Sequence, residues 1–157
     1  MKKQKGFSLI ELLIVVAIIL IIAAIAIPNL LRSRMAANEA SAVGSLRTIN
    51  TAEVTYATTY PAAGFAPLLT NLGGAAPCAN ATAASACLID DVLATTAIKS
   101  GYTFTAVGAA ALPAVTYFST AKPQVPGQSG QRYFCSDQSG VIRYNGAAAC
   151  ANTDPAL

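Results

Sequence analysis

The order of apolar and polar residues sets the first part of the chain apart. Leu12 to Ile27 is an unbroken run of sixteen apolar residues, and the stretch from Phe7 to Ile27 holds one charged residue, Glu11. As a helix, those twenty-one positions would span about 31 Å, close to the thickness of the hydrocarbon core of a bilayer. The pattern predicts a membrane-spanning helix.

A second helical pattern continues from Asn29 to Tyr60. Glu39 and Glu53 interrupt its apolar face, so that face is imperfect. We expect the helix to end at Pro61, because proline disfavours helical backbone in the residue before it. Pro28 removes one backbone hydrogen bond, and a kink or local break is expected there. The apolar positions recur at intervals of three, four or seven and are Met35, Ala42, Leu46, Ile49, Tyr56 and Tyr60.

Beyond Pro61 the chain consists of short segments separated by Gly, Pro and Ser. No period is recognisable as far as Ala86, and Cys87 to Ile98 fits a short helix that stops at Gly101. Closely spaced strands imply hairpins, with the clearest turn at Asp137–Gly140, and an antiparallel sheet. The predicted fold class is α+β: the second half of the long helix packs on the sheet and the first half protrudes. The predicted strands are Gly101–Val107, Ala114–Thr120, Gln131–Cys135 and Val141–Asn145.

Composition excludes several kinds of catalytic chemistry. The chain is 54% apolar and 11% charged, and it contains no His. Ser-His-Asp and Cys-His catalysis and imidazole metal sites are therefore excluded.

Asp90 and Asp91 are adjacent, but two carboxylates alone do not make a calcium site of six to eight oxygens. A solvated helix start is expected there. We predict no catalytic residue, no metal site and no cofactor, and we do not expect an enzyme.

The net charge of +3 is located at one end of the chain. Lys2, Lys3 and Lys5 supply it, because the remainder carries seven basic and seven acidic residues. The body is therefore neutral, without the basic surface of nucleic-acid-binding proteins, and no specific nucleic-acid partner is expected. Lysines directly before an apolar run stay on the cytoplasmic side. We expect a single pass through a membrane, with the residues after Ile27 exported.

Four cysteines fit an exported, oxidising location. They allow three connectivities. Cys78–Cys87 with Cys135–Cys150 is preferred, because each pair closes a short loop without crossing the other. The other connectivities and free thiols remain alternatives. Fewer than a hundred residues follow Pro61 and many of them are Ala, Thr or Gly, so the core is thin and disulfides would stabilise it.

One segment decides the functional interpretation, and it reads Lys5-Gly6-Phe7-Ser8-Leu9-Ile10-Glu11-Leu12-Leu13-Ile14-Val15-Val16-Ala17-Ile18. It resembles the amino terminus of type IV prepilins and of type II secretion pseudopilins, strongly over Lys5 to Leu31. The resemblance implies that a membrane peptidase cuts between Gly6 and Phe7 and methylates the new amine of Phe7. It also assigns Glu11 to filament assembly and Pro28 to bending of the helix. The pair Cys135–Cys150 is similar to the carboxy-terminal disulfide loop of many pilins.

Two plainer interpretations account for less of this segment. An ordinary secretory signal cleaved near Ile27 would have a shorter apolar run and no carboxylate at its start. A plain membrane anchor explains the length, but not the Gly6-Phe7 step before a lone Glu11. An ionised carboxylate in mid-bilayer costs about 2.5–3.5 kcal/mol. We therefore hypothesise that Glu11 pairs with the Phe7 amine of a neighbouring subunit, rather than only reaching to the membrane surface.

The resemblance implies a structural role. The expected protein is a major-type subunit of a type IV pilus, which serves adhesion, surface motility or DNA uptake and polymerises with copies of itself. Its other expected partners are the prepilin peptidase and methyltransferase, the assembly platform with its ATPase, and the membrane before assembly. The expected final location is an extracellular filament.

The expected organisation follows the same resemblance: a leader at 1–6, a transmembrane and filament-core helix at 7–28, its amphipathic half at 29–60, and a globular head at 61–157. The main rival function is a type II secretion pseudopilin. A membrane-tethered secreted enzyme and a minor DNA-uptake pilin are the others.

Overall fold

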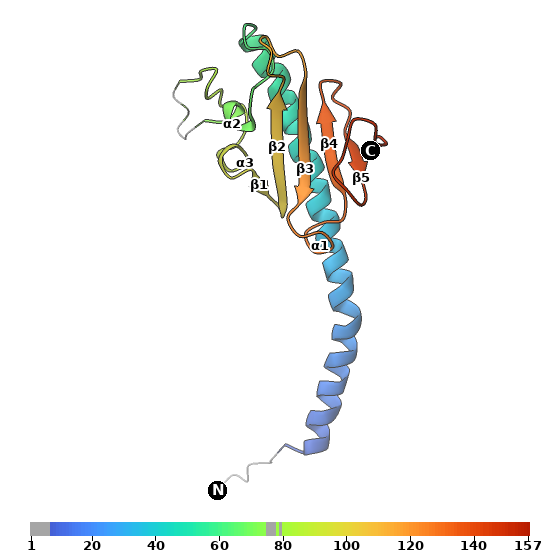
Figure 1. Cartoon of the computed structure of the whole chain (residues 1–157). Coiled ribbons are helices and arrows are strands. Elements are labelled where there is room, and N and C mark those ends of the chain that lie inside the picture. The colour runs from blue at the N-terminus through green and yellow to red at the C-terminus, as the bar shows by residue number, and fades with distance from the viewer. Residues whose placement is uncertain (1–6, 75–77, 79) are drawn as a thin grey trace. The chain divides into compact units, whose positions relative to one another are not determined.

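The computed structural model describes residues 7–74, 78 and 80–157, so Gly6 and the rest of the predicted leader lie outside the described residues. One long helix, α1, precedes two short helices and an antiparallel sheet, which confirms the predicted α+β class (Figure 1). The elements are α1 (Leu9–Thr59), α2 (Leu69–Leu72), α3 (Asp91–Thr95), β1 (Ile98–Lys99), β2 (Tyr102–Gly108), β3 (Tyr117–Pro123), β4 (Tyr133–Asp137) and β5 (Arg143–Asn145).

Helix α1 begins two residues after Phe7 and ends at Thr59, two residues before Pro61. It runs through Pro28 without interruption, so the local break expected there is wrong. Proline removes only one backbone donor from a helix. Ala, Ile and Leu on either side of Pro28 are compatible with helix and keep the remaining bonds.

The chain divides into two compact units at Arg34 and Met35, inside α1. In the first unit no described side chain from Phe7 to Arg34 is buried. The second unit, which we call the head, contains the core: the sheet is a meander in the order β1-β2-β3-β4-β5, with every pair antiparallel.

Within the head, one face of α1 and one face of the sheet enclose the core. Ala42, Leu46, Ile49 and Tyr56 are buried there, as the periodicity predicted. Strand β2 alternates along its length, with Tyr102, Phe104 and Ala106 turned inward, as a sheet with one covered face requires. From the other strands, Ala121 and Phe134 complete this cluster.

The short elements differ from the sequence prediction. The region 87–98 forms a helix only over Asp91–Thr95, and Ile98 and Lys99 leave it to pair with Thr103 and Tyr102 as β1. Positive φ angles of 54° at Ala97 and 49° at Ser100 end the helix and turn the chain into β2. Helix α2 was not predicted. The predicted turn after β4 is confirmed by a 2.9 Å bond from the Gly140 amide to the Asp137 carbonyl.

Candidate functional site

The start of α1 places the predicted assembly residue in the first helical turn. The Glu11 carboxylate accepts a 3.0 Å hydrogen bond, through Oε2, from the backbone N–H of Ser8. This is the reciprocal half of a capping box, the S-x-x-E pattern in which a glutamate satisfies an amide at the helix start. The spacing of Ser8 and Glu11 could have revealed this contact from the sequence. The bond also places a negative charge at the positive end of the helix dipole.

Phe7 precedes that turn with 78% of its surface exposed. The predicted cleavage bond joins it to Gly6, which is outside the described residues, so only one side of that bond is placed. Pro28 lies farther along α1 and is also exposed. Phe7 and Glu11 therefore lie close together at the start of α1, whereas Pro28 lies in a different part of the helix.

The helix surface around these residues is apolar on every side. Every large apolar side chain from Phe7 to Leu31 is between 46% and 80% exposed. Among the described residues, this is the one helix long and apolar enough to cross a membrane. A helix that is apolar all round needs lipid or other apolar helices around it.

In the head, the two glutamates of the apolar stripe are buried rather than solvated. Glu39 accepts bonds from the backbone amides of Gln131 (2.8 Å) and Arg132 (3.1 Å) and from Arg132 Nε (2.8 Å). Arg132 also lies over the rings of Phe134 and Tyr144, 5.3 and 5.6 Å from their centroids. Burial raises the pKa of Glu39, but these bonds outweigh it and the net pKa is lowered.

Glu53 lies on the same stripe in a different environment. It is 0% exposed, and the bond that it accepts is 2.8 Å long, from the Ala66 amide to Oε2. Burial, opposed only by that bond, raises the pKa of Glu53 to about 7.

A third polar contact joins α1 to the sheet through Asn50. Its amide Nδ2 donates to Ser136 Oγ at 2.8 Å, and its Oδ1 accepts from the Tyr117 hydroxyl at 3.0 Å. Asn50 therefore links α1 to β3 and β4. The sequence pattern did not predict the partners of Asn50, Glu39 or Glu53.

Comparisons with known proteins agree on the amino terminus. The family model described as "Prokaryotic N-terminal methylation motif" matches residues 1–27. The chain is 64% identical over 39 residues to the "Type IV wide pilus major component PilA4" of Thermus thermophilus. It is 44% identical over 54 residues to the "Type IV major pilin protein PilA" of Myxococcus xanthus. The amino-terminal part of the chain is thus similar to that of type IV major pilins.

The likeness covers a limited part of this chain and of its relatives. The two matches span 25% and 34% of the chain, and 30% and 24% of the respective relatives. No solved structure matches. The architecture of the head is therefore known from its own structure, not by analogy.

Two disulfides hold the loops of the head. Cys78 is joined to Cys87 with 6.2 Å between their Cα atoms, and Cys135 to Cys150 with 5.6 Å. These are the pairs that the sequence analysis preferred. The second bridge ties β4 to the carboxy-terminal loop, where the Asp154 carboxylate also accepts bonds from Asn145 and from the Ala151 amide.

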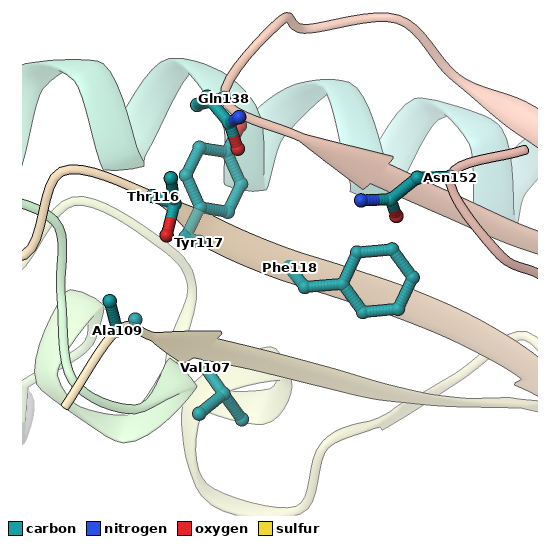
Figure 2. A pocket seen from close by; sticks show the side chains of 8 residues that line it. Val107, Ala109, Thr116, Tyr117, Phe118, Gln138 and Asn152 are labelled. Atoms are coloured by element: carbon teal, nitrogen blue, oxygen red, sulfur yellow. The ribbon is translucent and has the colours of Figure 1, made fainter.

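A shallow groove of about 290 Å³ lies at one end of the sheet (Figure 2). In the close-up the Asn152 amide lies beside the ring of Phe118, and Val107 projects from β2. None of the residues that line the groove is charged. Among the described residues, no group of three or more His, Cys, Asp or Glu side chains could hold a metal. The lining residues are Val107, Gly108, Ala109, Thr116, Tyr117, Phe118, Gln138 and Asn152.

Proposed function

We propose that this chain is the repeating structural subunit of a type IV pilus. One observation carries the proposal: the helix is apolar on every side from Phe7 to Leu31 and has one acidic residue, Glu11, in its first turn. Such a surface is stable in a bilayer and in a bundle of similar helices. Both relatives are named as major pilus components. Their names support the bundle of similar helices as the final environment of this helix.

The proposed pathway begins in the inner membrane, with the lysines before Gly6 on the cytoplasmic side. Cleavage after Gly6 frees the amine of Phe7, which is then methylated. The mature chain leaves the membrane through the pilus assembly platform and its ATPase, and it joins a helical polymer of identical chains outside the cell.

Polar pairing fixes the position of each chain in this polymer. Moving an apolar helix from lipid into a helix bundle gains little hydrophobic energy, because lipid tails are equally apolar. An ion pair between Glu11 and the Phe7 amine of a neighbour removes the cost of a lone charge and selects one register. The bond from Ser8 occupies Oε2, so Oε1 can accept the incoming amine while the helix start stays capped.

A charge-removing pair of variants tests this step. Glu11→Ala removes both the cap and the charge, whereas Glu11→Gln keeps a capping acceptor and removes only the charge. We expect cells carrying either variant to process the chain normally, as measured by intact mass and amino-terminal sequencing, and to make no filaments. Normal filaments from Glu11→Gln would show that the ion pair is not needed.

The same mass measurement tests processing. The mature wild-type chain should begin at Phe7 and carry one added methyl group. A chain that retains Met1, or one trimmed beyond Ala26, contradicts the proposed function.

The type II secretion pseudopilin is not favoured, because both relatives are named as pilus components. Electron microscopy of cells labelled for this chain distinguishes the two functions. Long surface fibres containing the chain are expected, and confinement to the periplasm would indicate the pseudopilin.

A further inference from the structure

The head contains a carboxyl group with no route to solvent. Glu53 is 0% exposed, and its Oε1 atom is buried without a hydrogen-bond partner among the described residues. Its other oxygen accepts from the Ala66 amide at 2.8 Å. A buried polar atom without a partner costs about 1–3 kcal/mol, and more when the group is charged. The structure therefore favours the neutral, protonated acid.

Within the described part of the chain, no cation faces this carboxyl group. On α1 its titratable neighbour is Tyr56, whose hydroxyl donates to the Ala83 carbonyl at 2.6 Å. On β3 it is Tyr117, whose hydroxyl donates to Asn50. Residues 61–68, which pack against Glu53, contain no charged residue. The two ion pairs of the described residues are elsewhere, at Glu39–Arg132 and Asp90–Lys99.

Farther away, Asp137 on β4 adds negative charge. It acts on Tyr117, as Glu53 does, and both charges raise the pKa of that phenol after the larger effect of burial. Among the described residues, no positive charge on α1, on the loop or on the sheet therefore compensates the charge of an ionised Glu53.

The contact of Glu53 is with the loop at 61–68, which connects α1 to α2. Backbone hydrogen bonds also join this loop to the end of β2 and to the segment between β2 and β3. The Phe65 amide donates to the Ala114 carbonyl at 2.9 Å, and the Gly108 amide donates to the Pro67 carbonyl at 3.2 Å. The loop lies so close to Gly108 that a Cβ there would come within 2.6 Å of the Ala66 carbonyl oxygen. Among these contacts, the one from Ala66 to Glu53 involves a group that titrates.

We propose that Glu53 is a pH-sensitive switch that holds the loop at 61–68 on α1 when protonated and releases it when ionised. The switch does not depend on the pilus function. Because the loop packs on Gly108, and Phe65 packs on Tyr117 with 4.8 Å between ring centroids, release also loosens one wall of the groove in Figure 2.

The direction of the pH effect follows from the proton balance. Burial raises the pKa of Glu53 to about 7 from its ordinary value of 4.5. Between those values the closed head binds a proton that a head with a hydrated Glu53 releases, so opening becomes easier as the pH rises. The opening constant should increase up to about tenfold per pH unit in this window and become level above it.

Hydrogen exchange of the full-length chain in detergent micelles measures this opening. The protection factors of the Ala66 and Gly108 amides, each corrected for the intrinsic exchange rate, should fall between pH 5 and about 7, by up to about tenfold per unit. In Glu53→Gln, which keeps an acceptor for Ala66 and cannot ionise, protection should stay constant over this range. In Glu39→Gln the wild-type pH dependence at Ala66 should persist, because Glu39 contacts a different loop.

The proposal is overturned if the protection factor of the wild-type Ala66 amide does not change with pH. It is also overturned if this protection factor has the same pH dependence in Glu53→Gln as in the wild type. If Glu53→Gln does not fold, a carbon NMR titration of the glutamate carboxyl groups in the wild type replaces it. One carboxyl should titrate near pH 7 in step with the Ala66 protection factor. Titration of every carboxyl below pH 5.5 would exclude the switch.

Discussion

Glu39 and Glu53 occupy the same face of one helix, yet their surroundings give them opposite acid–base behaviour. Glu39 meets Arg132 and two backbone amides, so its charged form is stabilised and its pKa is lowered. Glu53 meets one amide and, among the described residues, no cation, so its neutral form is favoured. The difference comes from the partners that the sheet and the loops supply.

Removal of the Glu39 carboxylate should destabilise the head. Glu39→Ala leaves the amides of Gln131 and Arg132 without their acceptor, at a cost of about 2–3 kcal/mol. Chemical denaturation at pH 7 measures it. Because the pKa is lowered on folding, this stabilisation is present above the ordinary value of 4.5 and is lost as the pH falls below it. The difference between wild type and Glu39→Ala should therefore shrink at pH 3.

Lys99→Ala is the matched control for that variant. The Lys99–Asp90 pair is 41% and 44% exposed, so its loss should cost less than about 1 kcal/mol. An equal loss of stability in the two variants would contradict the role assigned to burial.

Gly130 is a position where the absence of a side chain is required. A Cβ there would collide with the ring and hydroxyl of Tyr102, which is itself 0% exposed and donates to the Arg132 carbonyl at 2.9 Å. Gly130→Ala should lower the free energy of unfolding by about 1–3 kcal/mol. Gly146→Ala, where a Cβ would meet nothing within 4 Å, should change stability by less than about 0.5 kcal/mol. Thermal unfolding of both variants tests the contrast.

At the scale of elements, Gly44 is the weak point of α1. It lies in mid-helix, and a Cβ there would meet nothing within 4 Å. Gly44→Ala should stabilise the head by about 0.5–1 kcal/mol, because alanine loses less backbone entropy on becoming helical. Circular dichroism during denaturation measures the change, and a loss of stability would mean that another contact depends on this glycine.

The sequence pattern predicted those elements whose structure depends on residues close together in the chain. The apolar spacing of Leu46, Ile49 and Tyr56 indicated the buried face of α1, and Pro61 indicated its end. Strand β1 was missed because its two residues, Ile98 and Lys99, are strand only by pairing with β2. The break expected at Pro28 was wrong, because one missing donor does not interrupt a long helix.

In the candidate site, too, the features formed by neighbouring residues were predictable and the long-range contacts were not. The amino-terminal pattern around Glu11 is local and is readable in the sequence. The partners of Glu39 lie 92 and 93 positions away, and Ser136 lies 86 positions from Asn50. No short-range signal predicts such contacts, because they form only when the sheet docks on α1.

At the scale of the whole molecule, disulfides supply stability that a thin core lacks. The Cys135–Cys150 bridge closes a loop with a sequence separation of 15, which corresponds to about 3 kcal/mol on the chain-entropy model. The double variant Cys135→Ser, Cys150→Ser should lose about that much, as measured by denaturation without reductant. Non-reducing peptide mapping of the wild type is the check on the pairing, and a peptide joining Cys78 to Cys135 would contradict it.

The order of the strands also has a consequence for how the chain acquires its structure. Each strand of the meander pairs with its neighbour in sequence, so every pairing closes only a short loop and little entropy is lost at each step. Hairpins can therefore form one after another along the chain, and none of them has to wait for the residues that follow it. The docking of this ribbon onto α1 then joins residues far apart in the sequence, and it brings Glu39 and Asn50 together with partners 86 to 93 positions away.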